Sequence, residues 1–211
     1  MNKAFLELPE ERQQAILNAA YDEFGANGYD RASTNAIVAA ADISKGTLFN
    51  YFDSKAQLFT MLTKQALDLV NTAYISLLDH SQPDFLEKYR QATRIKYQAY
   101  RAHPHEFGFF NALYFYDSKE PVVVKAVKRI VKIRAQAEAF FAEDNDTSLF
   151  IPQLDPTETI RLMQYCLAGY ERDMMADIRN HATALENYDL LWEDFYRYLD
   201  LLRSVFYRKG A

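Results

Sequence analysis

The chain has few of the residues that interrupt or cross-link a fold. Its 211 residues include one cysteine, six glycines and six prolines. A single cysteine excludes an intrachain disulfide and favours a reducing compartment. The scarcity of glycine and proline leaves long stretches without a helix breaker, which is typical of an all-helical protein. Residues 1–9 show no signal-peptide pattern, and no uncharged apolar run reaches the roughly 18 residues of a membrane span. We therefore expect a cytoplasmic protein with no membrane segment.

The chain also lacks an excess of positive charge, since its net charge is -5. Proteins that bind nucleic acid without regard to sequence usually carry a large basic surface, so this class is disfavoured. A sequence-specific reader is not excluded, because screening limits the reach of exposed charges to about 10 Å at moderate salt. We expect weak non-specific DNA binding and a steep salt dependence of any specific binding.

Apolar residues recur at helical spacing through most of the chain, and capping residues mark where helices begin. The pattern predicts helices over residues 9–28, 83–103, 105–116, 119–143 and 188–208. Further helices should begin at the N-caps Ser33, Ser44, Ser54 and Asp155, with a capping box at residues 54–57. Residues 144–154 are polar and contain a proline, which indicates a loop. No stretch alternates as a strand does, so the predicted fold class is all-α.

Residues 33–52 carry the most specific pattern in the chain. They predict two short helices joined by a tight turn, with small, polar and aromatic side chains facing outward on the second helix. This is the form of a helix-turn-helix that reads DNA. We predict a three-helix DNA-binding domain over residues 1–55, followed by a larger domain of long helices over residues 56–211.

Four motifs lie within and around this segment: Phe24-Gly25-Ala26-Asn27-Gly28-Tyr29, Ile43-Ser44-Lys45-Gly46-Thr47-Leu48-Phe49, Tyr51-Phe52 and Ser54-Lys55. In these motifs the chain resembles the tetracycline-repressor-type (TetR) transcriptional regulators. The resemblance implies a ligand-responsive regulator, with ligand binding and dimerisation in the larger domain. Separately, no enzyme activity and no cofactor are predicted. Two positions depart from the family pattern. Asp42 stands where the family usually has glycine in the turn, and Phe49 replaces a frequent tyrosine.

We predict that the helix after Ser44 lies in the major groove of an operator and that its exposed residues contact DNA. Gly46 permits close approach, Asn50 can pair with adenine, and Phe49 can meet thymine methyl groups. Leu48 and Phe52 are expected to face inward. Phosphates are expected to meet Tyr51, Lys55 and the helix start at Ser33 and Thr34. The full predicted DNA-binding set is Ser33, Thr34, Lys45, Gly46, Thr47, Phe49, Asn50, Tyr51 and Lys55.

Dimerisation and ligand binding are expected in the larger domain, chiefly from the resemblance. Apolar stripes on the last two helices suit a homodimer that binds an inverted repeat, although the same stripes could close the monomer's own core. The aromatic-rich centre suits a small apolar or cationic ligand through contacts between rings and a cation. The candidate ligand-binding residues are Tyr97, Phe107, Phe110, Tyr114, Tyr170 and Glu171.

Other functions receive less support from the sequence. His103 and His105 flank a proline without the ligand spacing of a metal site, so no metal is predicted. Cys166 lies among apolar neighbours and is interpreted as a packed thiol. No catalytic motif is present. Two alternatives remain: an all-α protein that binds a small molecule, and a regulator whose effector is a protein partner.

Overall fold

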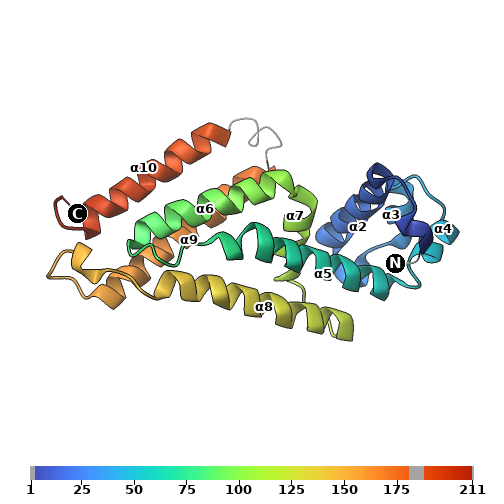
Figure 1. Ribbon diagram of the computed structural model, residues 1–211, viewed down its shortest axis with the longest axis horizontal. Coiled ribbons are helices and arrows are strands. Elements are labelled where there is room, and N and C mark those ends of the chain that lie inside the picture. The colour runs from blue at the N-terminus through green and yellow to red at the C-terminus, as the bar shows by residue number, and fades with distance from the viewer. Residues whose placement is uncertain (1–2, 181–187, 211) are drawn as a thin grey trace. The chain divides into compact units, whose positions relative to one another are not determined.

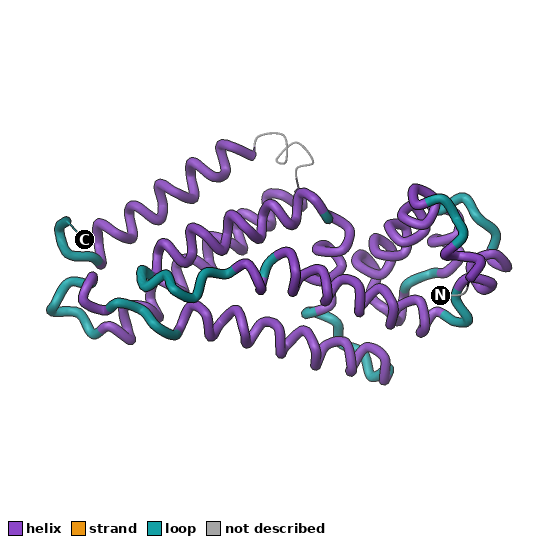
Figure 2. Tube along the Cα trace, in the orientation of Figure 1, coloured by secondary structure: helices purple, strands orange, loops and turns teal. Residues whose placement is uncertain are grey.

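The computed structural model describes residues 3–180 and 188–210, and side chains over 3–174 and 192–210. Within these ranges the chain is built from helices, joined by loops and turns (Figures 1 and 2). The helices are α1 (Lys3–Leu6), α2 (Glu10–Arg31), α3 (Thr34–Ala40), α4 (Lys45–Tyr51), α5 (Lys55–Ala73), α6 (Phe85–Ala102), α7 (Pro104–Leu113), α8 (Pro121–Ala142), α9 (Pro156–Asn180) and α10 (Tyr188–Phe206), with 3-10 turns η1 (Ile75–Leu77) and η2 (Thr147–Leu149). The all-α prediction is confirmed. None of the described helices is long and apolar enough to cross a membrane.

Four predicted N-caps are confirmed by hydrogen bonds. Ser33, Ser44 and Ser54 accept from the backbone N–H groups three residues later, at 3.3, 3.0 and 3.1 Å. Asp155 accepts from the N–H of Glu158 at 2.9 Å. Each bond satisfies a donor that the first turn of a helix leaves without a partner, which is why short polar residues mark helix starts.

Three details of the predicted helix ends are wrong. The side chain of Gln57 accepts from the N–H of Asp53, not of Ser54, so only half of the capping box forms. α6 begins after Asp84, whose Oδ1 accepts from two N–H groups, and not at the preceding proline. Gly28 has the left-handed φ of 68° expected of a helix end, but another helical turn follows it to Arg31.

The chain divides into two compact units. Unit 1 comprises residues 1–78 and 94–138, and unit 2 comprises 79–93 and 139–211. In unit 1, α2 packs on α3, α5 and α7, and α1 packs on α4. Rings of Phe24, Phe59 and Phe109 meet in its core. The helix-turn-helix thus shares one core with α5 and α7, while the boundary between residues 55 and 56 stays a prediction.

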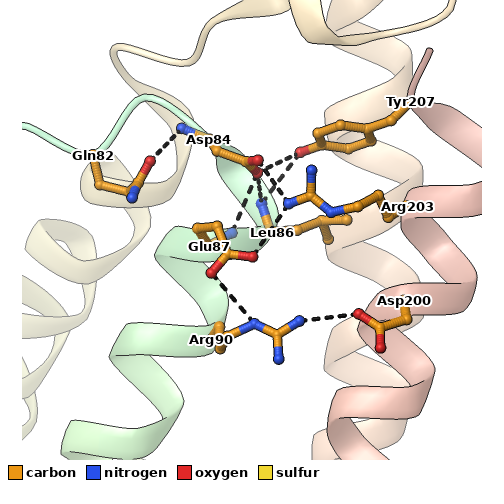
Figure 3. A network of polar contacts seen from close by, with 8 residues as sticks. All are labelled: Gln82, Asp84, Leu86, Glu87, Arg90, Asp200, Arg203 and Tyr207. Atoms are coloured by element: carbon orange, nitrogen blue, oxygen red, sulfur yellow. Dashed lines mark hydrogen bonds and ion pairs between the residues drawn. The ribbon is translucent and has the colours of Figure 1, made fainter. Parts of the chain in front are cut away.

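Unit 2 has its own apolar core, which includes Phe85, Met163, Phe195 and Leu199. A polar network ties the start of α6 to α10 beside this core (Figure 3). The Nη2 of Arg203 donates to the carboxylates of Asp84 and Glu87 at 2.7 and 3.2 Å. The hydroxyl of Tyr207 donates to Asp84 at 2.8 Å, and Arg90 connects Glu87 to Asp200. The network fixes the register of two helices that are far apart in sequence.

Candidate DNA-binding site

Two hydrogen bonds hold the turn between α3 and α4. Asp42 adopts a left-handed φ of 50°. Its carbonyl accepts from Arg12 Nη2 on α2 at 2.6 Å. The N–H of Ile43 donates to the carbonyl of Val38 at 3.0 Å. These bonds fix the angle at which α4 leaves α3.

The side chains of α4 divide into a buried face and an exposed face. Leu48 and the following Phe52 are buried, as predicted, and they anchor the helix. Lys45, Gly46, Phe49 and Asn50 are exposed.

Two further predicted contact residues are partly engaged within the fold. Thr47 is half-buried, and its hydroxyl lies 2.8 Å from the hydroxyl of Ser44. Tyr51 is also half-buried, with its ring 5.5 Å from that of Phe5. A Cβ at Gly46 would meet only the Ser44 hydroxyl oxygen, at an ordinary 3.7 Å. The fold itself therefore does not require glycine at this position.

Lys55 joins the start of α5 to the end of α2. Its Nζ donates to the carbonyl of Ala32 at 2.7 Å and lies 4.8 Å from the centre of the Tyr29 ring. Burial, and then the carboxylates of Glu120 and Asp30, raise the pKa of Tyr29, so this ring is a neutral phenol at neutral pH. The ammonium group has three N–H donors, so it can donate to the Ala32 carbonyl and also to a phosphate oxygen.

The start of α3 supplies the other predicted phosphate contacts. Ser33 is exposed, and its N–H donates to the carboxylate of Glu23 at 2.8 Å. Thr34 is half-buried at the first position of the helix. Unit 1 thus carries all nine predicted DNA-binding residues at α3, α4 and the start of α5. Their contacts with DNA stay predictions.

Comparison with known proteins identifies this segment. Residues 16–62 match the family described as bacterial regulatory proteins, tetR family. Over this segment, which is less than a quarter of its length, the chain is similar to the tetR family. The match covers α3, α4 and the start of α5, where the caps and the turn described above are found.

One curated relative is a transcriptional regulator, and two solved structures share the fold. The regulator RutR of Escherichia coli K12 is 30% identical over 101 residues, which are 47% of this chain and 46% of RutR. The chain therefore aligns with less than half the length of this relative. A tetR-family regulator from Chloroflexus aurantiacus is 18% identical, with a TM-score of 0.67 over 98% of both chains. AibR, solved in complex with isovaleryl coenzyme A and operator DNA, is 22% identical, with a TM-score of 0.54 over 75% of this chain and 83% of AibR.

The six candidate ligand residues are distributed over both units. Phe107 and Phe110 are buried in the core of unit 1. Tyr97 is half-buried and Tyr114 is exposed, and the guanidinium of Arg134 lies 3.7 Å from the Tyr114 ring centre. Tyr170 and Glu171 belong to unit 2, where the Tyr170 hydroxyl donates to Asp194 at 3.2 Å. A common ligand site for the six stays a prediction.

Two cavities in unit 1 are lined by none of these six residues. One, of about 500 Å³, lies between α5 and α8. The other, of about 390 Å³, is lined by α2, α5, α7 and His103. Sequence reasoning identified neither, although a run of basic residues on α8 was a visible signal for the first. In the part of the chain that the structure describes, no three His, Cys, Asp or Glu side chains are grouped to hold a metal ion.

Proposed function

We propose that this chain is a sequence-specific DNA-binding transcriptional regulator whose α4 reads the major groove. The observation that carries the proposal is the division of α4. Leu48 and Phe52 fix the helix from within, while Lys45, Phe49 and Asn50 are exposed. AibR, which shares the fold, was solved with operator DNA. The proposed function needs no catalytic step and is carried out in the cytoplasm. We favour repression over activation.

The proposal includes a homodimer on an inverted repeat, because one short recognition helix makes few base contacts. Apolar side chains on the last two helices support it. Leu162 and Tyr165 on α9, and Leu201 and Val205 on α10, are exposed. Such residues on both helices are suited to an interface between two copies.

We propose that a ligand shifts this dimer between two states with different spacing of the recognition helices. A ligand can do so only if it binds the two states with different affinity. An apolar or cationic ligand at the aromatic residues remains the expected effector. A protein effector is the alternative within this function, and a small-molecule-binding protein without a DNA role is the alternative to it.

The test is selection of bound duplexes from a random DNA pool, followed by titration of the enriched sequence across salt. We expect an inverted repeat bound by a dimer, with affinity that falls steeply as salt rises. Asn50→Ala should weaken binding to the enriched sequence by about 1–3 kcal/mol. Asn35→Ala is the matched control, since Asn35 is an exposed asparagine on α3 outside the predicted contact set. Failure of a folded dimer to enrich any sequence would contradict the proposal.

A further inference from the structure

The cavity between α5 and α8 is lined in part by apolar side chains. Its volume of about 500 Å³ lies within the range of small-molecule sites. Met61 from α5, and Val122 and Ala126 from α8, supply apolar surface. The groove therefore suits a ligand with a hydrocarbon part.

The charged side chains that line the groove are all positive. They are Lys64 on α5, and Lys125 and Arg129 on α8. Lys64 pairs with Asp68 at 2.6 Å. Lys125 and Arg129 are exposed, and neither forms an ion pair within the described residues. Residues 121–137 contain five basic residues and no acidic one, in a chain whose net charge is -5. The sign of charge at this groove is thus opposite to that of the whole protein.

A third observation concerns Thr63, which also lines the groove. Its side chain is 3% exposed, and its hydroxyl has no hydrogen-bond partner among the described residues. Buried polar groups normally have a partner, so the Thr63 hydroxyl is an unpaired polar group at a residue beside the groove.

From these observations we propose that the groove binds a free amphiphilic anion, a carboxylate with a medium-length hydrocarbon chain. The chain would lie against Met61, Val122 and Ala126. The carboxylate would accept hydrogen bonds from Lys125 and Arg129, because charge-assisted bonds to an anion are the strong ones. This ligand differs in the sign of its charge from the apolar or cationic one expected at the aromatic residues.

The groove also touches the segment that follows α4. Gln57 lines it, and the Gln57 side chain accepts from the N–H of Asp53 at 2.8 Å and donates to the Asp53 carboxylate at 2.7 Å. Asp53 lies in the turn between α4 and α5. A ligand that moves Gln57 would therefore disturb the support of α4. This second step, regulation of DNA binding, rests on the proposed function, whereas binding of the anion does not.

Calorimetry on the full chain without DNA tests the binding step. The probes are decanoate, decanol and decylammonium, which share a chain length and differ in charge, used below micelle-forming concentrations. We expect decanoate to bind most tightly. Lys125→Gln with Arg129→Gln should weaken decanoate binding at least about tenfold, since two charge-assisted bonds are removed. Val122→Trp should weaken it by filling the groove.

The matched control is Lys128→Gln with Lys132→Gln, which removes the same charge from exposed positions on α8 that do not line the groove. This pair should leave decanoate binding unchanged. Equal binding of decanoate and decanol, equal loss in both double variants, or no decanoate binding in the folded protein would overturn the proposal.

Regulation is tested separately with the enriched duplex. Decanoate should change duplex affinity in the unmodified chain and not in the Lys125→Gln, Arg129→Gln variant. Binding of decanoate with no effect on duplex affinity would overturn the regulatory step alone. If this variant lost duplex affinity but kept decanoate binding, the basic rim would be a phosphate contact and the ligand proposal would be wrong.

Discussion

Asp42 occupies a backbone conformation that favours glycine. Its φ of 50° is left-handed, which costs most L residues about 1–2 kcal/mol and aspartate less. The contact from Arg12 is made to the Asp42 carbonyl, so it survives substitution of the side chain. We expect Asp42→Gly to raise the free energy of unfolding by up to about 1 kcal/mol, measured by urea denaturation.

The control for Asp42→Gly is a second substitution to glycine, at a position inside the neighbouring helix α3. Ala39 is exposed near the end of α3, so Ala39→Gly should lower the free energy of unfolding by roughly 1 kcal/mol. Destabilisation by both substitutions would show that strain at position 42 does not limit stability.

Lys55 tests the predicted phosphate contacts. Lys55→Met should weaken binding to enriched and altered duplexes alike, and should lower the slope of log affinity against log salt by about 0.9 if one phosphate contact is lost. Lys64→Met on the same helix is the charge-matched control, with no expected change in slope. Because Lys55 also donates to Ala32, circular dichroism must show that the variant remains folded. An unchanged slope would remove Lys55 from the predicted site.

At the scale of elements, helix starts could be predicted because their determinants are local. The hydroxyl of a capping residue such as Ser44 accepts a hydrogen bond from the N–H three residues later. Both groups therefore lie within one short stretch of sequence, where the pattern can be recognised. The inward orientation of Leu48 and Phe52 followed from helical spacing in the same way. The exposed face of α4, and hence most of the candidate site, depends on this local information.

Features that depend on distant partners could not be predicted. α1 has only four residues, and its Phe5 is buried against Tyr51 and Phe52. Residues 144–154 were expected to be a loop, yet they contain η2 and the buried Phe150, which forms an isolated bridge with Tyr207. The contact of Lys55 with Ala32 spans 23 residues. Each of these depends on tertiary packing rather than on a local pattern.

Lys88 caps the end of α8 from within unit 2. It is 1% exposed, and its Nζ donates to the carbonyls of Phe140, Glu143 and Asp144 at 3.3, 2.6 and 3.4 Å. Burial lowers the pKa of Lys88, although nearby carboxylates oppose this effect. Lys88 lies three residues after Phe85 and therefore on the apolar face of α6. This spacing is visible in the sequence and indicates that Lys88 is buried.

We expect Lys88→Met to lower the free energy of unfolding by about 1–3 kcal/mol, because the carbonyls at the end of α8 lose their donor. Lys128→Met, at an exposed position on α8, should change it by less than about 0.5 kcal/mol. Both values can be measured by urea denaturation. Stabilisation by Lys88→Met would mean that desolvation of the ammonium outweighs its hydrogen bonds.

At the scale of the whole molecule, buried tyrosines should limit stability in alkali. Burial raises the pKa of Tyr21, Tyr116 and Tyr207 above its ordinary value of 10, and raises that of Tyr170 to about 12. A raised pKa in the folded state gives stability that is complete below pH 10 and is lost as pH rises through the folded value. The free energy of unfolding should therefore fall from pH 10 upward.

Tyr207→Phe tests this alkaline loss. Between pH 8 and pH 11, ionisation of one tyrosine in the unfolded chain lowers the free energy of unfolding by about 1.4 kcal/mol. The variant has no ionisable group at position 207, so this part of the decrease is absent. Urea denaturation at both pH values should show a decrease smaller by that amount in the variant. At pH 8 the variant should be less stable, because the bond from Tyr207 to Asp84 is absent. Equal decreases in both proteins would contradict the assignment.

The proposed homodimer predicts a position-specific response to charge. Leu201 on α10 is 56% exposed, and Val131 on α8 is 52% exposed, so the two differ chiefly in the helix that carries them. Burying a leucine side chain at the interface contributes about 1.5–3 kcal/mol to the free energy of dimerisation. In a twofold dimer each position occurs twice, so the substitution removes this contribution from both copies. Leu201→Arg should therefore raise the dimer dissociation constant by roughly 10²–10⁴-fold in sedimentation experiments, whereas Val131→Arg should leave it unchanged. A dimer that survives Leu201→Arg but dissociates with Val131→Arg would place the interface on α8 instead of the last two helices.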